Sequence, residues 1–316
     1  YKEIPLLLFW KNNDANALYQ RIKQLRKEYG YSPSPEVIND ICVNEILGGF
    51  KAFKQKSVVS EYPDDFVRKM RMTGLISFRG GGRFIDINHN EDEKIDYIIS
   101  TYSHYQKYEE ERSYFDYMAS VDKELLNIEG VVVSKNEAAI KLTEWMRVYN
   151  WDTIKVELDH LAKRTSSKDD TLKFIDAPSR LEFLTALAIK TQLPHVEVIP
   201  NFPIDDTGLP TSTAGGGIGD IECVEASNAI LVEVTMAQGR TQTIMEVWPI
   251  ERHLIEFKKK YGVPSQCVFV APSIFNDTVS QIEFVKFKNK RIIRPYKIDD
   301  FVGYLETSRT LYKKTV

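Results

Sequence analysis

Two short apolar runs separated by a tight turn constrain this chain more than any other feature. Residues 219–224 (GDIECV) and 229–235 (AILVEVT) are rich in apolar and β-branched side chains, and only four residues separate them. Such a pattern predicts a β-hairpin. The second run is almost continuously apolar before its carboxylate, which is typical of an interior strand. We therefore expect these residues to lie inside a sheet.

The register of this hairpin brings two carboxylates together. If the turn is centred between Ala226 and Ser227, Asp220 lies opposite Glu233. Directly opposed residues have Cβ atoms about 4.5–5.5 Å apart, so the two charges would repel each other in a plain sheet. Mg²⁺ takes one or two carboxylates together with waters and a substrate phosphate, so the pair predicts a metal site. The open alternative is that Asp220 is a loop carboxylate and Glu233 faces solvent.

Composition limits the classes to which the chain can belong. Of its 316 residues, 43% are hydrophobic and 28% charged, which is the balance of a globular protein with room for several domains. No apolar run approaches the roughly 20 residues that cross a bilayer. The net charge of −3 provides no overall attraction to DNA, so any contact depends on local cations. Three scattered cysteines, Cys42, Cys223 and Cys267, favour neither disulfides nor zinc and indicate a reducing cytoplasm.

The chain separates by pattern into three regions, which we expect to be domains of a multi-domain α/β protein. Residues 1–90 show short helices followed by a hairpin, which together predict a winged-helix-like DNA-recognition subdomain. Residues 91–176 are mainly helical in pattern and predict a linker. Residues 177–316 mix helix and strand patterns and contain the hairpin. The expected helices are 15–29, 34–50, 63–73, 105–126, 135–149, 179–192 and 241–261, the last starting or kinking at Pro249, and a buried strand is expected at 266–271.

Four arginines of the first region are candidates for contact with DNA. Arg68 and Arg71 lie on the third expected helix, and Arg79 and Arg83 flank the glycine turn of its hairpin. Such cations can meet phosphates, and a helix of this kind can enter the major groove. The open alternative is an ordinary solvated surface.

The order of three acidic residues resembles the core of the PD-(D/E)xK nucleases. Glu182 in RLEF, Asp220 in GDIE and Glu233 in VEVT follow the sequence helix, strand, strand. The stretch 178–253 is similar to the cleavage domain of Type IIS restriction and nicking endonucleases of the AlwI kind, especially the large nicking-type subunits that recognise GAGTC. These proteins combine an N-terminal recognition part, a helical linker and a C-terminal nuclease domain with a mixed sheet, which is the order of the three regions.

The resemblance also implies ligands and partners. It implies Mg²⁺ or another divalent cation such as Mn²⁺, double-stranded DNA as substrate, a small second subunit for the other strand, and a bacterial cytoplasm. Because the chain starts at Tyr1, we expect recognition material upstream and a longer parent chain.

One position departs from the family pattern. The usual lysine of the third motif is Thr235 here, and threonine cannot supply a positive charge beside the attacking water. The resemblance implies that a downstream glutamate and histidine line the site, which by position are Glu246 and His253. A lone histidine among charged neighbours is otherwise an ordinary surface residue, and Glu182 is otherwise a carboxylate on a solvated helix face.

The leading hypothesis is a Mg²⁺-dependent endonuclease that nicks one strand of duplex DNA. Asp220 and Glu233 would hold the metal, with Glu182, Glu246 and His253 completing the catalytic set. The alternative is a non-catalytic winged-helix DNA-binding protein with a degenerate nuclease domain. The glycine-rich segment 215–219 leads into a strand rather than a helix, so it does not predict a nucleotide site.

Overall fold

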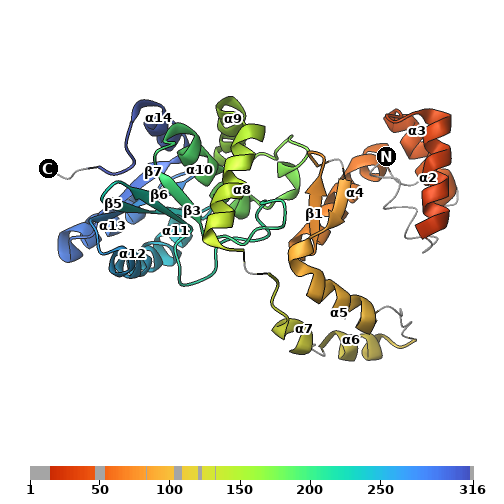
Figure 1. Cartoon of the computed structure of the whole chain (residues 1–316), viewed down its shortest axis with the longest axis horizontal. Coiled ribbons are helices and arrows are strands. Elements are labelled where there is room, and N and C mark those ends of the chain that lie inside the picture. Colours follow the sequence, from red (N-terminus) through yellow and green to blue (C-terminus); the bar gives the residue numbers. More distant parts are fainter. Residues whose placement is uncertain are drawn as a thin grey trace.

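The computed structural model describes residues 15–46, 54–82, 84–102, 109–119, 123–131 and 133–313. A five-stranded sheet with helices on both faces forms the C-terminal part, and short helices with a two-stranded hairpin precede it (Figure 1). Within these residues, no helix combines the length and the apolar character that crossing a membrane requires.

The large sheet is mixed, as its strand pairing shows. Its strands are β3 (Glu197–Pro200), β4 (Ile221–Glu225), β5 (Asn228–Val234), β6 (Ser265–Ala271) and β7 (Ile293–Lys297), in that spatial order. The first three strands pair antiparallel and the last three parallel. Glu222 pairs with Leu231 and Val224 with Ala229, so the predicted register is confirmed. β5 is the central strand, which agrees with its apolar composition.

Successive side chains of β5 point to opposite faces of the sheet, and each face packs in a separate hydrophobic core. The helices around the sheet are α8 (Lys135–Val148), α9 (Trp151–Ala162), α10 (Ala177–Gln192), α11 (Gly239–Met245), α12 (Val247–Tyr261), α13 (Asn276–Asn289) and α14 (Ile298–Thr307). Ile230 and Val232 pack in the core of α8, α9, α10 and α14. Ala229 and Leu231 pack in the core of α12 and α13. Because side chains alternate along a strand, Glu233 belongs to the α12 face.

The helix predicted over residues 241–261 is two helices. The break falls at Glu246, which follows the end of α11 and precedes the start of α12, and not at Pro249. Pro249 lies in the first turn of α12, where its missing N–H leaves no bond unmade. Glu246 therefore lies between α11 and α12 and belongs to neither helix.

The N-terminal part follows the predicted order of helices and hairpin. Its elements are α2 (Ala15–Tyr29), α3 (Pro35–Ile41), α4 (Tyr62–Met72), β1 (Ile76–Arg79), β2 (Phe84–Ile87), α5 (Asp92–Tyr102), α6 (Glu111–Ala119) and α7 (Lys123–Asn127). The order fits a winged helix, and that arrangement stays a prediction. The helix predicted over 105–126 was wrong in extent, because residues 109 and 110 form a bend and α6 begins at Glu111; residues 105–108 and 120–122 of that prediction lie outside the described residues.

α4 and β1 pack directly against the C-terminal part. Val67 and Phe78 are buried in the same core as α10. Arg71 is 3% exposed, and its Nη1 donates to Oδ2 of Asp205 at 2.5 Å and to the carbonyl of Ile76 at 2.6 Å. This core also takes in α8 and α9, so packing continues across the predicted boundary at 176.

Candidate active site

Asp220 and Glu233 meet at one edge of the central hairpin. Asp220 directly precedes β4, and one step beyond the Ile221–Val232 pair it lies opposite Glu233. Its Oδ2 accepts a hydrogen bond from the backbone N–H of Val234 at 2.7 Å. Glu233 is 5% exposed, so it does not face solvent. The structure thus brings together the two carboxylates that the register predicts.

Gly219 makes this approach possible. A Cβ built at Gly219 would lie 2.8 Å from Oε1 of Glu233 and would also collide with the Leu231 side chain. Only a residue without a side chain lets the backbone pass this close to the carboxylate.

Electrostatics at the pair is unfavourable without a cation. Burial, and then the charge of Glu233, raises the pKa of Asp220 well above its usual value. Burial, and then Glu246, raises the pKa of Glu233 in the same way. Buried like charges of this kind are rare in structural positions and common at sites that bind a cation.

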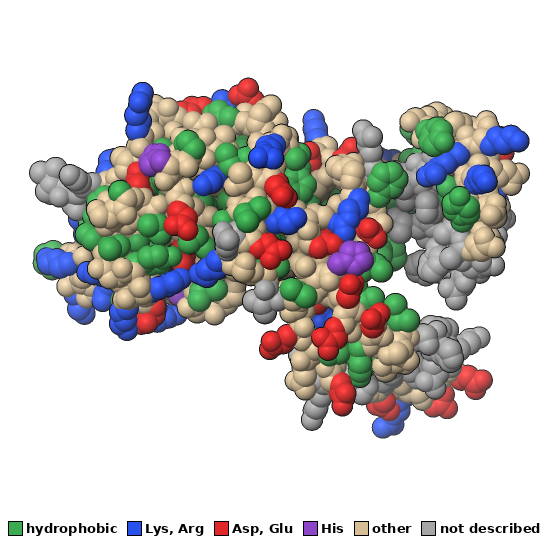
Figure 2. Space-filling model, viewed as in Figure 1, with side chains coloured by type: hydrophobic (Ala, Val, Ile, Leu, Met, Phe, Trp, Pro, Cys, Tyr) green, Lys and Arg blue, Asp and Glu red, His purple; other side chains and the backbone are tan. Residues whose placement is uncertain are grey.

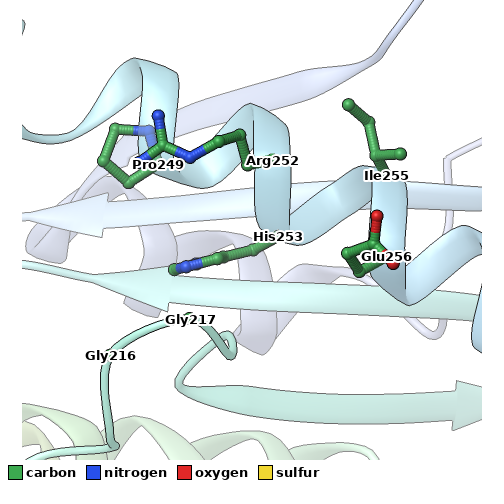
Figure 3. Close-up of a pocket in the computed structure, with 7 residues that line it drawn as sticks. All are labelled: Gly216, Gly217, Pro249, Arg252, His253, Ile255 and Glu256. Carbon is green, nitrogen blue, oxygen red and sulfur yellow. The ribbon is translucent and has the colours of Figure 1, made fainter.

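His253 lies within hydrogen-bond distance of one carboxylate of this pair. Its Nδ1 lies 2.9 Å from Oε1 of Glu233, and burial lowers its pKa. A neutral ring that donates from Nδ1 keeps an acceptor at Nε2. Figure 3 shows the ring pointing from α12 towards the backbone at Gly216 and Gly217. These residues line a hollow of about 550 Å³. The hollow is also lined by Pro249, Arg252, Ile255 and Glu256. His253 is therefore not an ordinary surface residue.

Thr235, which occupies the position of the motif lysine, forms a hydrogen bond with Glu246. The Thr235 hydroxyl donates to Oε1 of Glu246 at 2.7 Å and accepts from the N–H of Ala237 at 3.0 Å. Burial raises the pKa of Glu246. Glu246 lies at the break between α11 and α12, and the hydrogen bond from Thr235 fixes the orientation of its carboxylate.

Glu182 joins the acidic cluster from the opposite side of the sheet. It is 3% exposed, which excludes a solvated helix face. Burial, and then Asp220, raises its pKa to about 9. Its Oε2 accepts from the N–H of Ala214 at 2.9 Å, so it also tethers the segment that leads to Gly219.

The donor set fits a magnesium-type ion. Among the residues that the structure describes, no three His, Cys, Asp or Glu side chains converge into a ready-made metal cage. Mg²⁺ does not need one, because it is usually bound by one or two carboxylates, with waters and substrate phosphate filling the remaining positions. Two opposed, buried carboxylates with the unfavourable charge of Asp220 and Glu233 match that requirement.

The four arginines predicted to contact DNA have different surroundings. The guanidinium of Arg71 is buried and bonded to Asp205, so it does not face solvent. Arg79 donates to Oδ2 of Asp206 at 2.6 Å and is partly exposed. Nε of Arg68 donates to the carbonyl of Lys173 at 3.0 Å, and its side chain is exposed. Arg83 lies outside the described residues.

Asn201 supports the site, although no sequence motif marks it. Its backbone N–H donates to the carbonyl of Asp220 at 2.9 Å, and its Nδ2 donates to the carbonyl of Gly219 at 2.7 Å. Only the pairing of β3 with β4 brings this residue here, and that pairing spans a long connection that no local pattern predicts.

Opposed buried carboxylates on a mixed α/β sheet, with His253 and the buried Glu182 of α10 beside them, match the organisation expected of a restriction-endonuclease core. Comparison with known families agrees. The AlwI restriction endonuclease family matches residues 133–303, more than half of the chain, and the chain belongs to this family.

A solved structure is also similar to this chain. It is the small subunit of the heterodimeric restriction endonuclease R.BspD6I, at 27% identity and a TM-score of 0.40, over 48% of this chain and 76% of that one. No curated protein gave a match.

Proposed function

We propose that this chain is a Mg²⁺-dependent endonuclease that hydrolyses a phosphodiester of duplex DNA near a recognition site and nicks one strand as a monomer. The observation that carries the proposal is the buried, opposed pair Asp220 and Glu233 with His253 hydrogen-bonded to it. Membership of the AlwI family supports DNA as the substrate. The described residues contain one such acidic pair, which would cut one strand per bound chain.

Asp220 and Glu233 would hold the metal, which can be Mg²⁺ or Mn²⁺. When bound, such an ion stabilises negative charge on the phosphoryl oxygens and lowers the pKa of a bound water. Glu182 would complete the acidic cluster from α10, and it keeps the segment before Gly219 in place through Ala214.

His253 and Glu246 would orient the attacking water and accept its proton. Nδ1 of His253 donates to Glu233, so Nε2 can accept the proton of a water aligned for in-line attack on phosphorus. Glu246, oriented by Thr235, supplies a second acceptor for that water. In this arrangement the Thr235–Glu246 hydrogen bond, which orients an acceptor and supplies no positive charge, stands where the family pattern has lysine.

The domain organisation follows from the same proposal. Residues 1–90 are the recognition part, in which Arg68, Arg79 and Arg83 remain candidates for phosphate contact. Figure 2 shows acidic side chains gathered over α5, α6 and α7, which suits a spacer held away from the DNA backbone. We place the start of the cleavage domain near residue 133 rather than 177, because α8 and α9 share the core of α10. A small second subunit would cut the other strand.

A supercoiled-plasmid assay tests the function. Wild-type protein with Mg²⁺ should convert supercoiled DNA to open circles, and EDTA or Asp220→Ala should prevent the conversion. Linear product would contradict nicking by a monomer. Binding of duplex DNA with no cleavage in either Mg²⁺ or Mn²⁺ would instead support the alternative, a DNA-binding protein with a degenerate nuclease domain.

A further inference from the structure

Beside the acidic pair, two lysines meet over one buried glutamate. Glu222 is 6% exposed, and its Oε1 accepts from Nζ of Lys260 at 2.7 Å. Its Oε2 accepts from the Tyr261 hydroxyl at 2.7 Å and from Nζ of Lys135 at 3.3 Å. Lys135 is the first residue of α8, and Lys260 lies in the last turn of α12. Elements far apart in the sequence thus deliver two ammonium groups to one carboxylate.

The charges of these three groups do not balance. One carboxylate faces two ammonium groups, which leaves one positive charge. The lysine side chains remain 53% and 47% exposed, so this charge is accessible from solvent. Burial, and after it the neighbouring Lys260, lowers the pKa of Lys135. Exposed like charges normally turn away from each other, but here the buried Glu222 holds both lysines in place.

Asn201 connects these lysines to the cleavage site. Its Oδ1 accepts from Nζ of Lys135 at 3.3 Å, while its other polar groups bond Gly219 and Asp220. Along the chain, Glu222 is two residues from Asp220, a distance of about 7 Å in extended conformation. Neighbouring phosphates along one DNA strand are separated by a similar distance through space, so the lysines lie about one nucleotide from the cleavage site.

We propose that Lys135 and Lys260 form a clamp for one backbone phosphate of the DNA, next to the phosphate that is cut. Lysine is a compact point charge that suits the oxygens of a phosphodiester. Glu222 and Tyr261 hold the ammonium groups and do not touch the DNA. The clamp rests on the proposed nuclease function, and it fixes the register of the strand relative to Asp220.

The clamp predicts a position-specific loss of DNA affinity. The cut site is first mapped by sequencing plasmid nicked by wild-type protein. Duplexes with a single uncharged methylphosphonate at each position around the cut are then bound to the full chain carrying Asp220→Asn, which does not cleave. One neutral linkage, about one nucleotide from the cut, should weaken binding on the order of tenfold. Adding Lys135→Gln and Lys260→Gln should remove the effect at that position.

The salt dependence of binding counts the phosphates that the clamp holds. Because both ammonium groups serve one phosphate, the double lysine variant should reduce the slope of log affinity against log salt by about 1, and not by 2. Lys135→Arg with Lys260→Arg should retain the slope. Lys155→Gln with Lys190→Gln removes the same charge from α9 and α10, and should leave the methylphosphonate profile unchanged.

Three outcomes would overturn the clamp. One is a methylphosphonate profile that is the same with and without the two lysines. Another is a lysine variant whose affinity falls equally at all positions together with its thermal stability, which would make the cluster purely structural. A wild-type chain that cuts no plasmid would remove the proposed function and the clamp with it, whereas a cutting enzyme with an unchanged profile would remove the clamp alone.

Discussion

Buried charges occur in two regions of this molecule, with opposite surroundings. In the N-terminal part, the Arg71 guanidinium faces Asp205 and the carbonyls of Ile76, Leu209 and Pro210. In the cleavage region, the buried Asp220 faces Glu233, a charge of its own sign. The first charge is neutralised by the protein itself. The repulsion at the second is relieved by a bound cation or by protonation of a carboxyl group.

This difference separates structural from functional charge. A buried ion pair contributes little net stability, but removing one partner leaves an uncompensated charge and destabilises the fold strongly. A buried pair of like charges destabilises the fold while both are present, so it persists where a ligand requires it. Substitutions in the two regions should therefore change stability in opposite directions.

The largest effect is expected at Asp220. Asp220→Asn keeps an acceptor for the Val234 N–H but removes a metal-binding charge, which contributes several kcal/mol to the transition state. Plasmid nicking should fall about 10³-fold or more. The free energy of unfolding in metal-free buffer should stay constant or rise, because a repulsion is removed. Nicking rates and urea denaturation, run in parallel, measure both quantities, and an unfolded variant would show that Asp220 is structural.

Arg71 should behave in the opposite way. Arg71→Ala leaves Asp205 buried without its cation, so the free energy of unfolding should fall by about 3–5 kcal/mol. Arg68→Ala is the matched control, because Arg68 is exposed and makes one hydrogen bond to a carbonyl. Urea denaturation should show little change for the control. Equal stability of the two variants would contradict the structural role assigned to Arg71.

Thr235 tests whether a hydrogen bond has replaced the family lysine. Thr235→Val keeps the shape but loses the bond to Glu246, so cleavage at saturating metal should fall about 10–100-fold. Thr235→Ser keeps the hydroxyl and should retain most of the activity. If the serine variant is as slow as the valine variant, the methyl group and its packing matter rather than the hydroxyl.

Local pattern predicted the hairpin and its register correctly for a physical reason. The alternation of side chains has a period of two, and a tight turn admits few registers, so Val224 had to pair with Ala229. That register placed Asp220 opposite Glu233. The roles of Glu182, Glu246 and His253 came from resemblance to a family, because the spacing of these residues did not distinguish a site from a solvated face.

The remaining features depend on contacts between distant parts of the chain. Arg71 and Asp205 are 134 residues apart, and Lys135 and Glu222 are 87 apart. No helical or strand period carries information over such separations. For this reason the sequence suggested that Arg71 faces DNA, whereas the structure buries it. The lysine cluster at Glu222 was not predicted at all.

Glu225 tests the difference between structural and functional charge with the smallest expected effect. It is a buried carboxylate whose hydrogen-bond partners all come from the protein itself. Its Oε2 accepts from the N–H groups of Leu311 and Tyr312 at 3.0 and 2.8 Å, and its Oε1 lies 3.1 Å from Nε2 of His195. Burial alone would raise the pKa of Glu225, but these hydrogen bonds outweigh it and lower the pKa below its ordinary value of 4.5.

A carboxylate whose pKa is lower in the folded state stabilises the fold above its unfolded pKa, and the stabilisation is lost as the pH falls through the folded pKa. Glu225→Gln should therefore lower the free energy of unfolding by about 1–2 kcal/mol at neutral pH. The difference from wild type should shrink as the pH falls below 4.5, where the native carboxyl becomes protonated. Urea denaturation of both proteins across this range measures the difference. A gap that stays constant with pH would mean that the C-terminal segment is held by the shape of Glu225 and not by its charge, and the contrast with Asp220 would then no longer rest on electrostatics.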